Sequence, residues 1–204
     1  MIKFELCKYN EMLPKDLKDF YCIRKKIFKD KLDWLVKCVD GMEFDEYDND
    51  NTSYLTGKIE GKIICGCRFI DMNLQNMCTG VFYKYFNNMQ ILKGNYVEVT
   101  RIFIDKDNLF DYRRLQNVRL NFYLNIYNFA KEAGYEGVYA VVTKQLLSSL
   151  IRAGWKVMIQ QQGVSEKNER IYLIVMPTND KTVGGLMKNL HNSYPDHIEI
   201  ERMF

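Results

Sequence analysis

The chain of 204 residues has few of the features that divide or anchor a protein. It has three prolines, twelve glycines and no low-complexity tract, so we expect a single domain spanning residues 1–204. No apolar run approaches the ~20 residues of a membrane-spanning helix. The first ten residues, MIKFELCKYN, mix charged with apolar side chains and predict no signal peptide, which favours a cytoplasmic location.

Patterns that bind metals or nucleic acids are also scarce. The six cysteines are scattered without a C-x-x-C pair, and neither of the two histidines lies near a cysteine in sequence. We therefore predict reduced thiols and no metal site, rather than a disulfide framework or a zinc site. A net charge of +3 with 27% charged residues argues against both a disordered tail and a strongly cationic nucleic-acid binder.

What the chain does have is a core, since 47% of its residues are apolar and 14% are aromatic. Alternating patterns predict strands at 3–9, twice within 52–71, and at 96–105, 137–143, 155–162 and 170–177. Helical spacing predicts helices at 13–34, 113–133, 144–154 and about 181–191, with a short helix possible at 80–86. This order predicts an α/β (α+β) fold with one central, mixed, largely antiparallel sheet flanked by helices.

The strand at 96–105, YVEVTRIFID, carries charges where a buried strand normally has none. Strict alternation puts Glu98, Thr100 and Ile102 on one face and Arg101 and Phe103 on the other. If Glu98 and Arg101 serve one site, the strand must contain a bulge, because one extra residue re-aims every side chain beyond it. The alternative is that Glu98 lies at an exposed sheet edge.

Two further arginines stand at inward positions. Arg24 lies within the apolar stripe of the first predicted helix, and Arg68 lies among apolar residues of the strand KIICGCRFID. The acidic loop at 40–51 offers Glu43, Asp45 and Asp48 as partners. One interpretation is an arginine–carboxylate network that orders the N-terminal region over a site. The other is an arginine stem along apolar surface and a solvated turn, and spacing leaves both open.

Five segments, in order between residues 24 and 155, carry a resemblance to a known family. They are RKKIF…LDWLV, GMEFDEYDNDNTSYL, GKIICGCRFI, VEVTRIFI and VVTKQLLSSLIRAGW. In these segments the chain resembles the LuxI-type acyl-homoserine-lactone synthases, the autoinducer synthases of bacterial quorum sensing. Thr100 stands where that family commonly has serine, which keeps a hydroxyl, and Ile102 separates Arg101 from Phe103.

The resemblance implies a GNAT-like three-layer fold with a cleft between the central strands for a phosphopantetheine arm. It also implies that acyl-acyl-carrier protein donates an acyl group to the amine of S-adenosylmethionine. Lactonisation would then release methylthioadenosine and the quorum-sensing signal. Both molecules are substrates, so no permanently bound cofactor is expected, and no membrane insertion or nucleic-acid partner either.

Residue roles follow from the same resemblance. Glu98 and Arg101 would be catalytic, Glu98 as the base that deprotonates the amine directly or through water. The residues expected to form the S-adenosylmethionine pocket and its network are Arg24, Phe28, Trp34, Glu43, Asp45, Asp48 and Arg68. Those expected to line the acyl and phosphopantetheine cleft are Thr100, Phe103, Val142 and Thr143.

Two parts of this assignment have plainer alternatives. A hydroxyl at Thr143 goes with 3-oxoacyl chains of short to medium length in the family, but Thr143 is also suited to cap the following helix. Lys144, Arg152 and Lys156 are candidates for docking the acidic carrier protein near the thioester, although an ordinary solvated surface charge is the favoured interpretation of each residue taken singly.

Two other functions stay open from the sequence. A GNAT-type N-acyltransferase using acyl-CoA would usually carry a glycine-rich pyrophosphate loop before the long helix, and the segment DKDNLFDYRRLQ contains no glycine. A non-catalytic GNAT-like binding module would not need Glu98, Arg101, Arg24 and two acids together.

Overall fold

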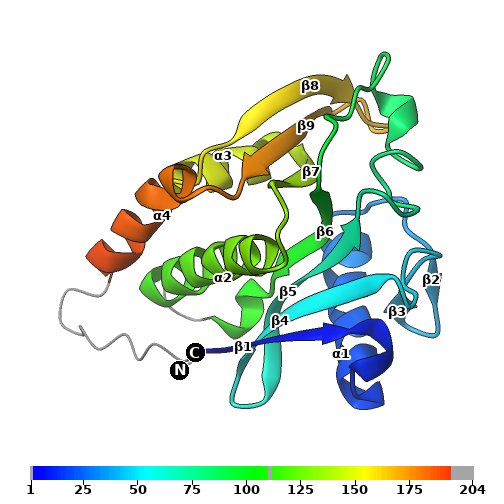
Figure 1. The fold of residues 1–204 in the computed structure, drawn as a ribbon. Coiled ribbons are helices and arrows are strands. Elements are labelled where there is room, and N and C mark those ends of the chain that lie inside the picture. The colour runs from blue at the N-terminus through cyan, green and yellow to red at the C-terminus, as the bar shows by residue number, and fades with distance from the viewer. Residues whose placement is uncertain (1, 110–111, 194–204) are drawn as a thin grey trace.

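A seven-stranded sheet with the order β1-β4-β5-β6-β7-β9-β8 forms the centre of the molecule (Figure 1). The structure is a computed structural model that describes residues 2–109 and 112–193. The strands of this sheet are β1 (Lys3–Lys8), β4 (Thr52–Ile59), β5 (Lys62–Asp71), β6 (Tyr96–Ile104), β7 (Gly137–Thr143), β8 (Met158–Val164) and β9 (Arg170–Pro177). A separate pair joins β2 (Cys38–Val39) to β3 (Met42–Glu43). Neighbouring strands are antiparallel except β6 and β7, which are parallel.

Helices cover both faces of the sheet (Figure 1). The α-helices are α1 (Pro14–Arg24), α2 (Tyr112–Glu132), α3 (Lys144–Ala153) and α4 (Asp180–Ser193). Short helical turns are η1 (Tyr9–Glu11), the π-helix η2 (Lys25–Lys31), η3 (Tyr83–Tyr85) and η4 (Lys106–Asn108). One apolar cluster joins α2, α3 and α4 to the sheet, and a second joins α1 to β4, β5 and β6. The predicted mixed three-layer arrangement is confirmed.

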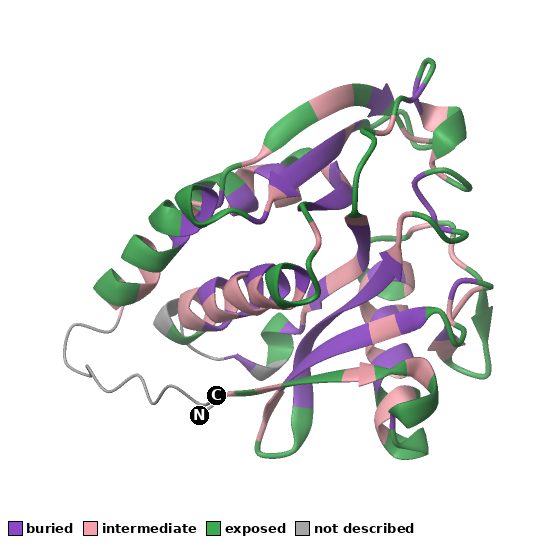
Figure 2. Ribbon diagram, in the orientation of Figure 1, coloured by how far each residue is buried: buried purple, intermediate pink, exposed green. Residues whose placement is uncertain are grey.

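The longest helix follows its sequence pattern closely. Val118, Phe122 and Ile126 of the predicted apolar stripe are buried in the core, as helical spacing requires. Gly134 follows the helix with a φ of +77°, the left-handed conformation in which glycine commonly ends helices. Burial is highest in the central strands, while β1 and β8 at the sheet edges are more exposed (Figure 2).

The predicted helix at 13–34 differs from the structure. It is α-helical only to Arg24 and continues as the π-helix η2, in which the Leu32 N–H bonds the Ile27 carbonyl five residues back. Lys26 and Lys31 in this turn form ion pairs with Asp107 after β6. These ion pairs tie η2 to the segment after β6, a contact that helix propensity does not encode.

Three smaller boundaries also differ. The possible helix at 80–86 is only the short turn η3, the strand expected at 155–162 begins at Met158, and the start of the acidic loop contains β3, which pairs with β2 just before the loop. Among the described residues, no helix is long and apolar enough to cross a membrane.

The parallel pair at the centre of the sheet is short. β6 and β7 pair only through Tyr96–Glu98 and Gly137–Tyr139, whereas both strands continue well beyond these residues. β7 instead keeps its full antiparallel pairing with β9. The sheet therefore opens between β6 and β7, and the residues beyond Glu98 and Tyr139 are free to line a cavity.

Candidate active site

A bulge in β6 decides which side chains reach this opening. Gly66 of β5 pairs with Phe103 and Arg68 pairs with Thr100, so Cys67 alone stands opposite Arg101 and Ile102. Arg101 has a φ of +54°, a left-handed conformation that costs a non-glycine residue roughly 1–2 kcal/mol. The predicted bulge is present, and it turns Arg101 toward the same side of the sheet as Glu98 and Thr100.

Three arginines and three carboxylates form a buried network on this side. Arg24 donates from Nε to Glu43 at 2.6 Å and from Nη1 and Nη2 to Asp48 at 2.7 and 2.9 Å. Arg101 donates from Nη2 to Glu43 at 2.9 Å and to Asp45 at 2.7 Å. The paired charges balance, which is the condition under which buried ions are tolerated.

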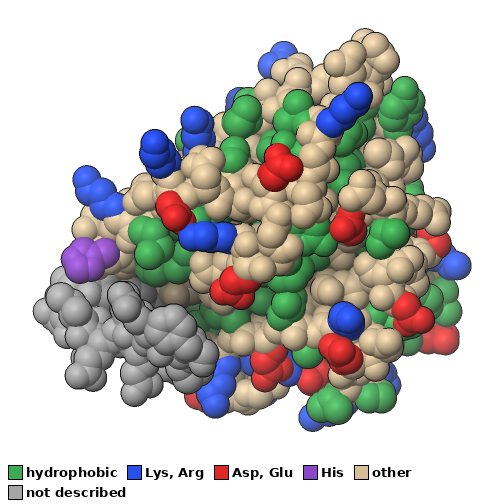
Figure 3. Space-filling view, in the orientation of Figure 1, with side chains coloured by type: hydrophobic (Ala, Val, Ile, Leu, Met, Phe, Trp, Pro, Cys, Tyr) green, Lys and Arg blue, Asp and Glu red, His purple; other side chains and the backbone are tan. Residues whose placement is uncertain are grey.

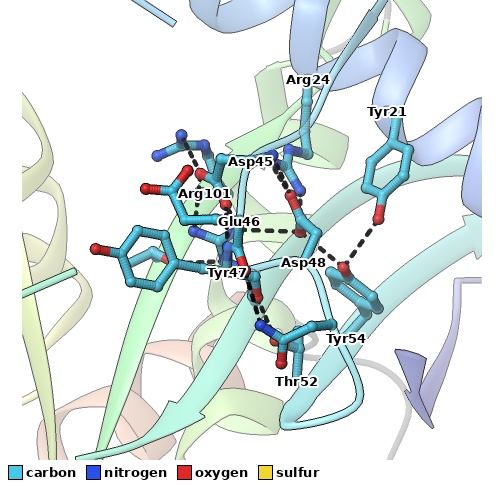
Figure 4. Close-up of polar contacts among 12 residues, drawn as sticks. Tyr21, Arg24, Asp45, Glu46, Tyr47, Asp48, Thr52, Tyr54 and Arg101 are labelled. Carbon is cyan, nitrogen blue, oxygen red and sulfur yellow. Dashed lines mark hydrogen bonds and ion pairs between the residues drawn. The ribbon is translucent and has the colours of Figure 1, made fainter. Parts of the chain in front are cut away.

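Arg68 completes the network from β5. Its Nη1 donates to Asp45 at 2.5 Å and lies 3.0 Å from an Asp48 oxygen, while its Nε donates to the Thr100 hydroxyl at 3.1 Å. Side chains from α1, β5, β6 and the segment at 43–48 thus meet at one place, as Figure 4 shows for those it labels. The structure thus joins Arg24 and Arg68 to the acidic loop, as the network interpretation has it, and adds Arg101 to the same network.

Asp48 also anchors two tyrosines (Figure 4). The Tyr54 hydroxyl donates to Asp48 at 2.7 Å and lies 3.2 Å from the Tyr21 hydroxyl. Burial alone would raise the pKa of Asp48, but the guanidinium groups of Arg24 and Arg68 hold it below its usual range. Burial and the Asp48 charge raise the pKa of Tyr54. Asp48 is therefore ionised and both tyrosines are neutral.

A cavity of about 300 Å³ lies between this network and the diverging strands. Phe28 and Trp34 form one wall, with stacked rings whose centroids are 5.0 Å apart. Val142 and Thr143 of β7 form part of the opposite wall. Asp45 and Arg101 are the network residues that line the cavity, whereas Arg24, Glu43, Asp48 and Arg68 lie behind them.

Arg101 has unused hydrogen-bonding capacity at the cavity. Its Nε and Nη2 are held by carboxylates, but the contact of its Nη1 is with the Met77 sulfur at 3.5 Å, a weak acceptor. The side chain is 7% exposed and lines the cavity. An Arg101 Nη1 group in this state is available to a carboxylate or carbonyl oxygen of a ligand.

Glu98 is fully buried and is not among the side chains that line the cavity. Its carboxylate accepts the backbone N–H groups of Met77 at 2.9 Å and Cys78 at 2.6 Å. Met77 itself lines the cavity, so Glu98 contacts a cavity-lining residue without lining the cavity. Burial raises the pKa of Glu98, although its hydrogen bonds with Cys78 and Met77 oppose this.

The structure separates Phe103 from the expected acyl cleft. The ring centroids of Phe103 and Phe20 are 5.2 Å apart. Phe103 lies with Tyr54 in the α1 cluster and does not line the cavity. The bulge is the reason. Its extra residue shifts the alternation, so Phe103 points to the face opposite to the one that strict alternation predicts. Thr100, Val142 and Thr143 do line the cavity, as expected from the resemblance.

The sequence left two positions open for Thr143, at the wall of a cavity and at the cap of a helix, and the structure shows both. Its hydroxyl accepts the Leu146 N–H at 3.4 Å and so caps α3, and the residue also lines the cavity. The cap is long, so the hydroxyl is only weakly engaged.

The three basic candidates do not form one patch. Lys144 begins α3 beside Thr143, whereas Arg152 ends that helix and Lys156 follows it. Eight helical residues span about 12 Å, so Arg152 lies that far from Lys144. All three side chains are exposed. Figure 3 shows Lys and Arg side chains frequent in the region of α3 and α4, with Asp and Glu more frequent lower in the view.

Several cavity residues escaped the sequence analysis. They are Tyr47, Met77, the η3 region with Val81, Phe82 and Tyr85, and the β8–β9 turn with Glu166 and Lys167. Tyr47 lies in the acidic loop already suspected, and the Arg68 guanidinium stands 5.7 Å from its ring centroid. The others come from segments without a chemical pattern, so nothing in the sequence indicated them.

Comparison with known proteins gives a consistent family and fold. The sequence profile of the family described as Autoinducer synthase matches residues 8–186. The acyl-homoserine-lactone synthase of Dickeya chrysanthemi is 44% identical over 192 residues, which cover 93% of this chain and 87% of that protein. These matches confirm the resemblance found in the sequence.

Two solved structures support the fold. The AHL synthase LasI has a TM-score of 0.81 at 19% identity, covering 92% of this chain and 95% of that chain. BjaI, a CoA-dependent acyl-homoserine lactone synthase solved with SAM and isopentyl-CoA, has a TM-score of 0.81 at 18% identity, covering 93% of this chain and 90% of that chain. The expected GNAT-like fold is confirmed.

Proposed function

The chain belongs to the autoinducer synthase family, and on that premise we propose that it makes an acyl-homoserine lactone from S-adenosylmethionine and an acyl-carrier-protein thioester. Its class, acyl-homoserine-lactone synthase and hence acyltransferase, rests on the family match and the curated relatives. The observation that carries the proposal is one cavity shared by the arginine–carboxylate network and the diverging strands β6 and β7.

The network side of the cavity suits S-adenosylmethionine. Phe28 and Trp34 offer apolar ring faces, and Asp45 and Glu46 offer carboxylates for the cationic ammonium and sulfonium. Arg101 Nη1 is the proposed donor to the substrate carboxylate. Arg24, Glu43, Asp48 and Arg68 would act from behind, by fixing the positions of Asp45 and Arg101.

The opening between β6 and β7 suits a linear thioester arm. Val99, Ile102 and Val142 give it apolar walls, and the bulge leaves backbone N–H groups outside the regular ladder. Such groups, aimed at the thioester oxygen, would stabilise the charge that develops during attack. Thr143 is the proposed contact of a 3-oxo group on the acyl chain.

The reaction has two bond exchanges. The amine nitrogen attacks the thioester carbonyl, the carbon–sulfur bond breaks, and the carrier leaves as a thiol. The substrate carboxylate then attacks the carbon beside the sulfonium, and methylthioadenosine leaves with that bonding pair. Glu98 is the proposed acceptor of the ammonium proton, which would reach it through water near Met77. A raised pKa suits a base that acts near neutral pH.

The segment after β6 favours a carrier protein over acyl-CoA as the donor. Asp105 accepts the Asp107 backbone N–H, and the carboxylates of both residues are ion-paired with Lys26. The described part of this connection contains no glycine, and the Asp107 N–H is already bound by Asp105, so the segment does not form a glycine-rich loop for a pyrophosphate. Acyl-CoA remains the second candidate donor because the structurally similar BjaI is CoA-dependent.

The test of the proposal is expression of the chain in a bacterium that makes no such signal, followed by mass spectrometry of the culture extract. An acyl-homoserine lactone is expected in the extract. Purified protein given S-adenosylmethionine with acyl-carrier protein or with acyl-CoA then identifies the donor. Soluble, folded protein that yields no lactone with either donor would contradict the proposed function.

The 3-oxo assignment has its own test. Thr143→Gly removes the hydroxyl while glycine still tolerates the cap position at a cost of a few tenths of a kcal/mol. We expect the ratio of 3-oxoacyl to unsubstituted product to fall in this variant and to be kept in Thr143→Ser. An unchanged ratio in Thr143→Gly would leave Thr143 as a helix cap only.

A further inference from the structure

Two segments distant in the sequence meet over the cavity. Trp34–Lys37, after η2, and Ser165–Glu169, the turn between β8 and β9, both line it. Lys167 joins them, since its Nζ lies 3.0 Å from Asp33 Oδ2 and donates to the Leu32 carbonyl at 3.3 Å. The family resemblance gave this turn no role, and Lys167 links it directly to the turn that precedes Trp34.

The residue that Lys167 contacts is conformationally strained. Asp33 has a φ of +51°, in the left-handed region that non-glycine residues rarely occupy. The next residue is Trp34, whose N–H bonds the Phe28 carbonyl at 2.8 Å and whose ring stacks on Phe28. The conformation of Asp33 therefore decides whether the Trp34 ring reaches the cavity wall.

The β8–β9 turn is itself well held, so it can serve as an anchor. Ser165 N–H bonds the Glu169 carbonyl and Asn168 N–H bonds the Ser165 carbonyl, both at 2.9 Å. Glu166 is hydrogen-bonded to Tyr85 on another wall of the cavity, and burial together with this bond raises the pKa of Tyr85 to about 12. A fixed turn thus contacts two walls at once.

We propose that Lys167 is a positioning residue for the amine-substrate half of the cavity, which holds Trp34 against Phe28 by fixing the Leu32–Asp33 turn. The proposal rests on the proposed function for the identity of that substrate, S-adenosylmethionine. Asp33 is 78% exposed and Lys167 30% exposed, and such pairs contribute only about 0–1 kcal/mol to global stability. The contact is therefore suited to a local task rather than to stabilising the whole fold.

A second cation also faces Asp33. Lys29 Nζ lies 3.8 Å from Asp33 and is the other cation facing it, but Lys29 belongs to the same helical turn and cannot tie that turn to the hairpin. Removing Lys167 therefore breaks the link across the cavity even though Lys29 remains.

Trp34 supplies a readout that needs no substrate. The chain has two tryptophans, and the other, Trp155, is 2% exposed and donates to the Pro177 carbonyl. Acrylamide quenching of tryptophan fluorescence should rise in Lys167→Ala and return to the wild-type level in Lys167→Arg. Trp34→Phe gives the signal of Trp155 alone. Arg170→Ala is the matched control, because it removes an exposed cation from the same hairpin outside the cavity.

Kinetics test the substrate part. We expect Lys167→Ala to raise the KM for S-adenosylmethionine by about 2- to 5-fold, which is the effect expected from the loss of an exposed ion pair. The kcat should change by less than about 2-fold. Asp33→Gly keeps the left-handed backbone but removes the carboxylate. Because both substitutions break the same contact, their effects on the KM for S-adenosylmethionine should not add in the double variant.

The outcomes separate the two proposals. Unchanged quenching in Lys167→Ala overturns the positioning role, and so does raised quenching with an unchanged KM for S-adenosylmethionine. If the wild-type protein does not bind S-adenosylmethionine at all, the proposed function falls, and the quenching of ligand-free protein alone decides the role of Lys167.

Discussion

Charged residues inside the core act here as a set rather than singly. Arg24, Arg68 and Arg101 each contact at least two carboxylate side chains, so no arginine depends on one partner. An arrangement of this kind fixes side-chain positions more than it adds stability, because desolvation offsets much of the attraction. The loss of any one member should leave an uncompensated buried charge.

Asp48 gives the first prediction. Its folded pKa is lowered, so its contribution to stability is complete above the unfolded value of about 3.9 and is lost as the pH falls below it. Asp48→Asn should cost roughly 3–5 kcal/mol at neutral pH and should flatten the pH dependence of unfolding below about pH 4. Urea unfolding at several pH values measures both, with Asp50→Asn, exposed on the same loop, as the control.

Glu98 gives the second prediction. Glu98→Gln should lower turnover by about 10²- to 10⁴-fold with the circular dichroism spectrum preserved, because a base in proton transfer contributes that much. Burial raises the pKa of Glu98, so the acid limb of the wild-type rate profile should lie above the ordinary value for glutamate. Glu132→Gln, exposed at the end of α2 and outside the cavity, is the control. If Glu46→Gln abolished turnover and Glu98→Gln did not, the base would be Glu46.

At the scale of elements, the bulge of β6 and the π-helix η2 shape the site. The bulge brings Arg101 to the network, and η2 follows Arg24 in such a way that Phe28 lines the cavity. Both are departures from regular structure, which recur at functional sites because they re-aim side chains.

The bulge can be tested through its strained residue. Arg101→Gly and Arg101→Ala both remove the guanidinium group, but only glycine adopts a positive φ without a steric cost. Arg101→Gly should therefore be more stable than Arg101→Ala by about 1 kcal/mol in chemical denaturation, with both variants inactive. Equal stability would mean that the bulge relaxes when the side chain is lost.

At the scale of the whole molecule, one short parallel pair organises the fold. Three residue pairs hold β6 to β7, and beyond them the β1–β6 half and the β7–β8 half of the sheet separate (Figure 1). The cavity takes its walls from both halves, from the segment at 81–85 and from the β8–β9 turn. Substrate binding should therefore be sensitive to contacts between the halves, such as that of Lys167 with Asp33.

Docking of a carrier protein also belongs to this scale. Because Lys144 lies beside the cavity and Lys156 beyond the far end of α3, Lys144→Glu should raise the KM for acyl-carrier protein by about 3-fold or more, and Lys156→Glu by less. The difference should shrink as salt is added, since exposed charges are screened. Equal effects of the two variants would argue against docking centred on Lys144.

The sequence by itself determined much of this. The apolar stripe of α2, the alternation of the strands and the order of the chemical segments predicted the elements, the mixed sheet and the family. Charges at inward positions made a network of Arg24 and Arg68 with Glu43, Asp45 and Asp48 one of two interpretations, since buried ions require partners. The conflict between Glu98 and Arg101 on one strand predicted a bulge. These inferences succeeded because they depend on local periodicity and on the cost of burying charge.

Only the tertiary structure decided the rest. It put Phe103 in the α1 cluster, and it put Glu98 outside the cavity lining, held by the N–H groups of Met77 and Cys78. It also brought Tyr85 and Lys167 to the cavity from segments without a chemical signature. The physical reason is that each position depends on contacts between residues far apart in the chain, such as Lys167 with Asp33, and no local pattern encodes such pairs.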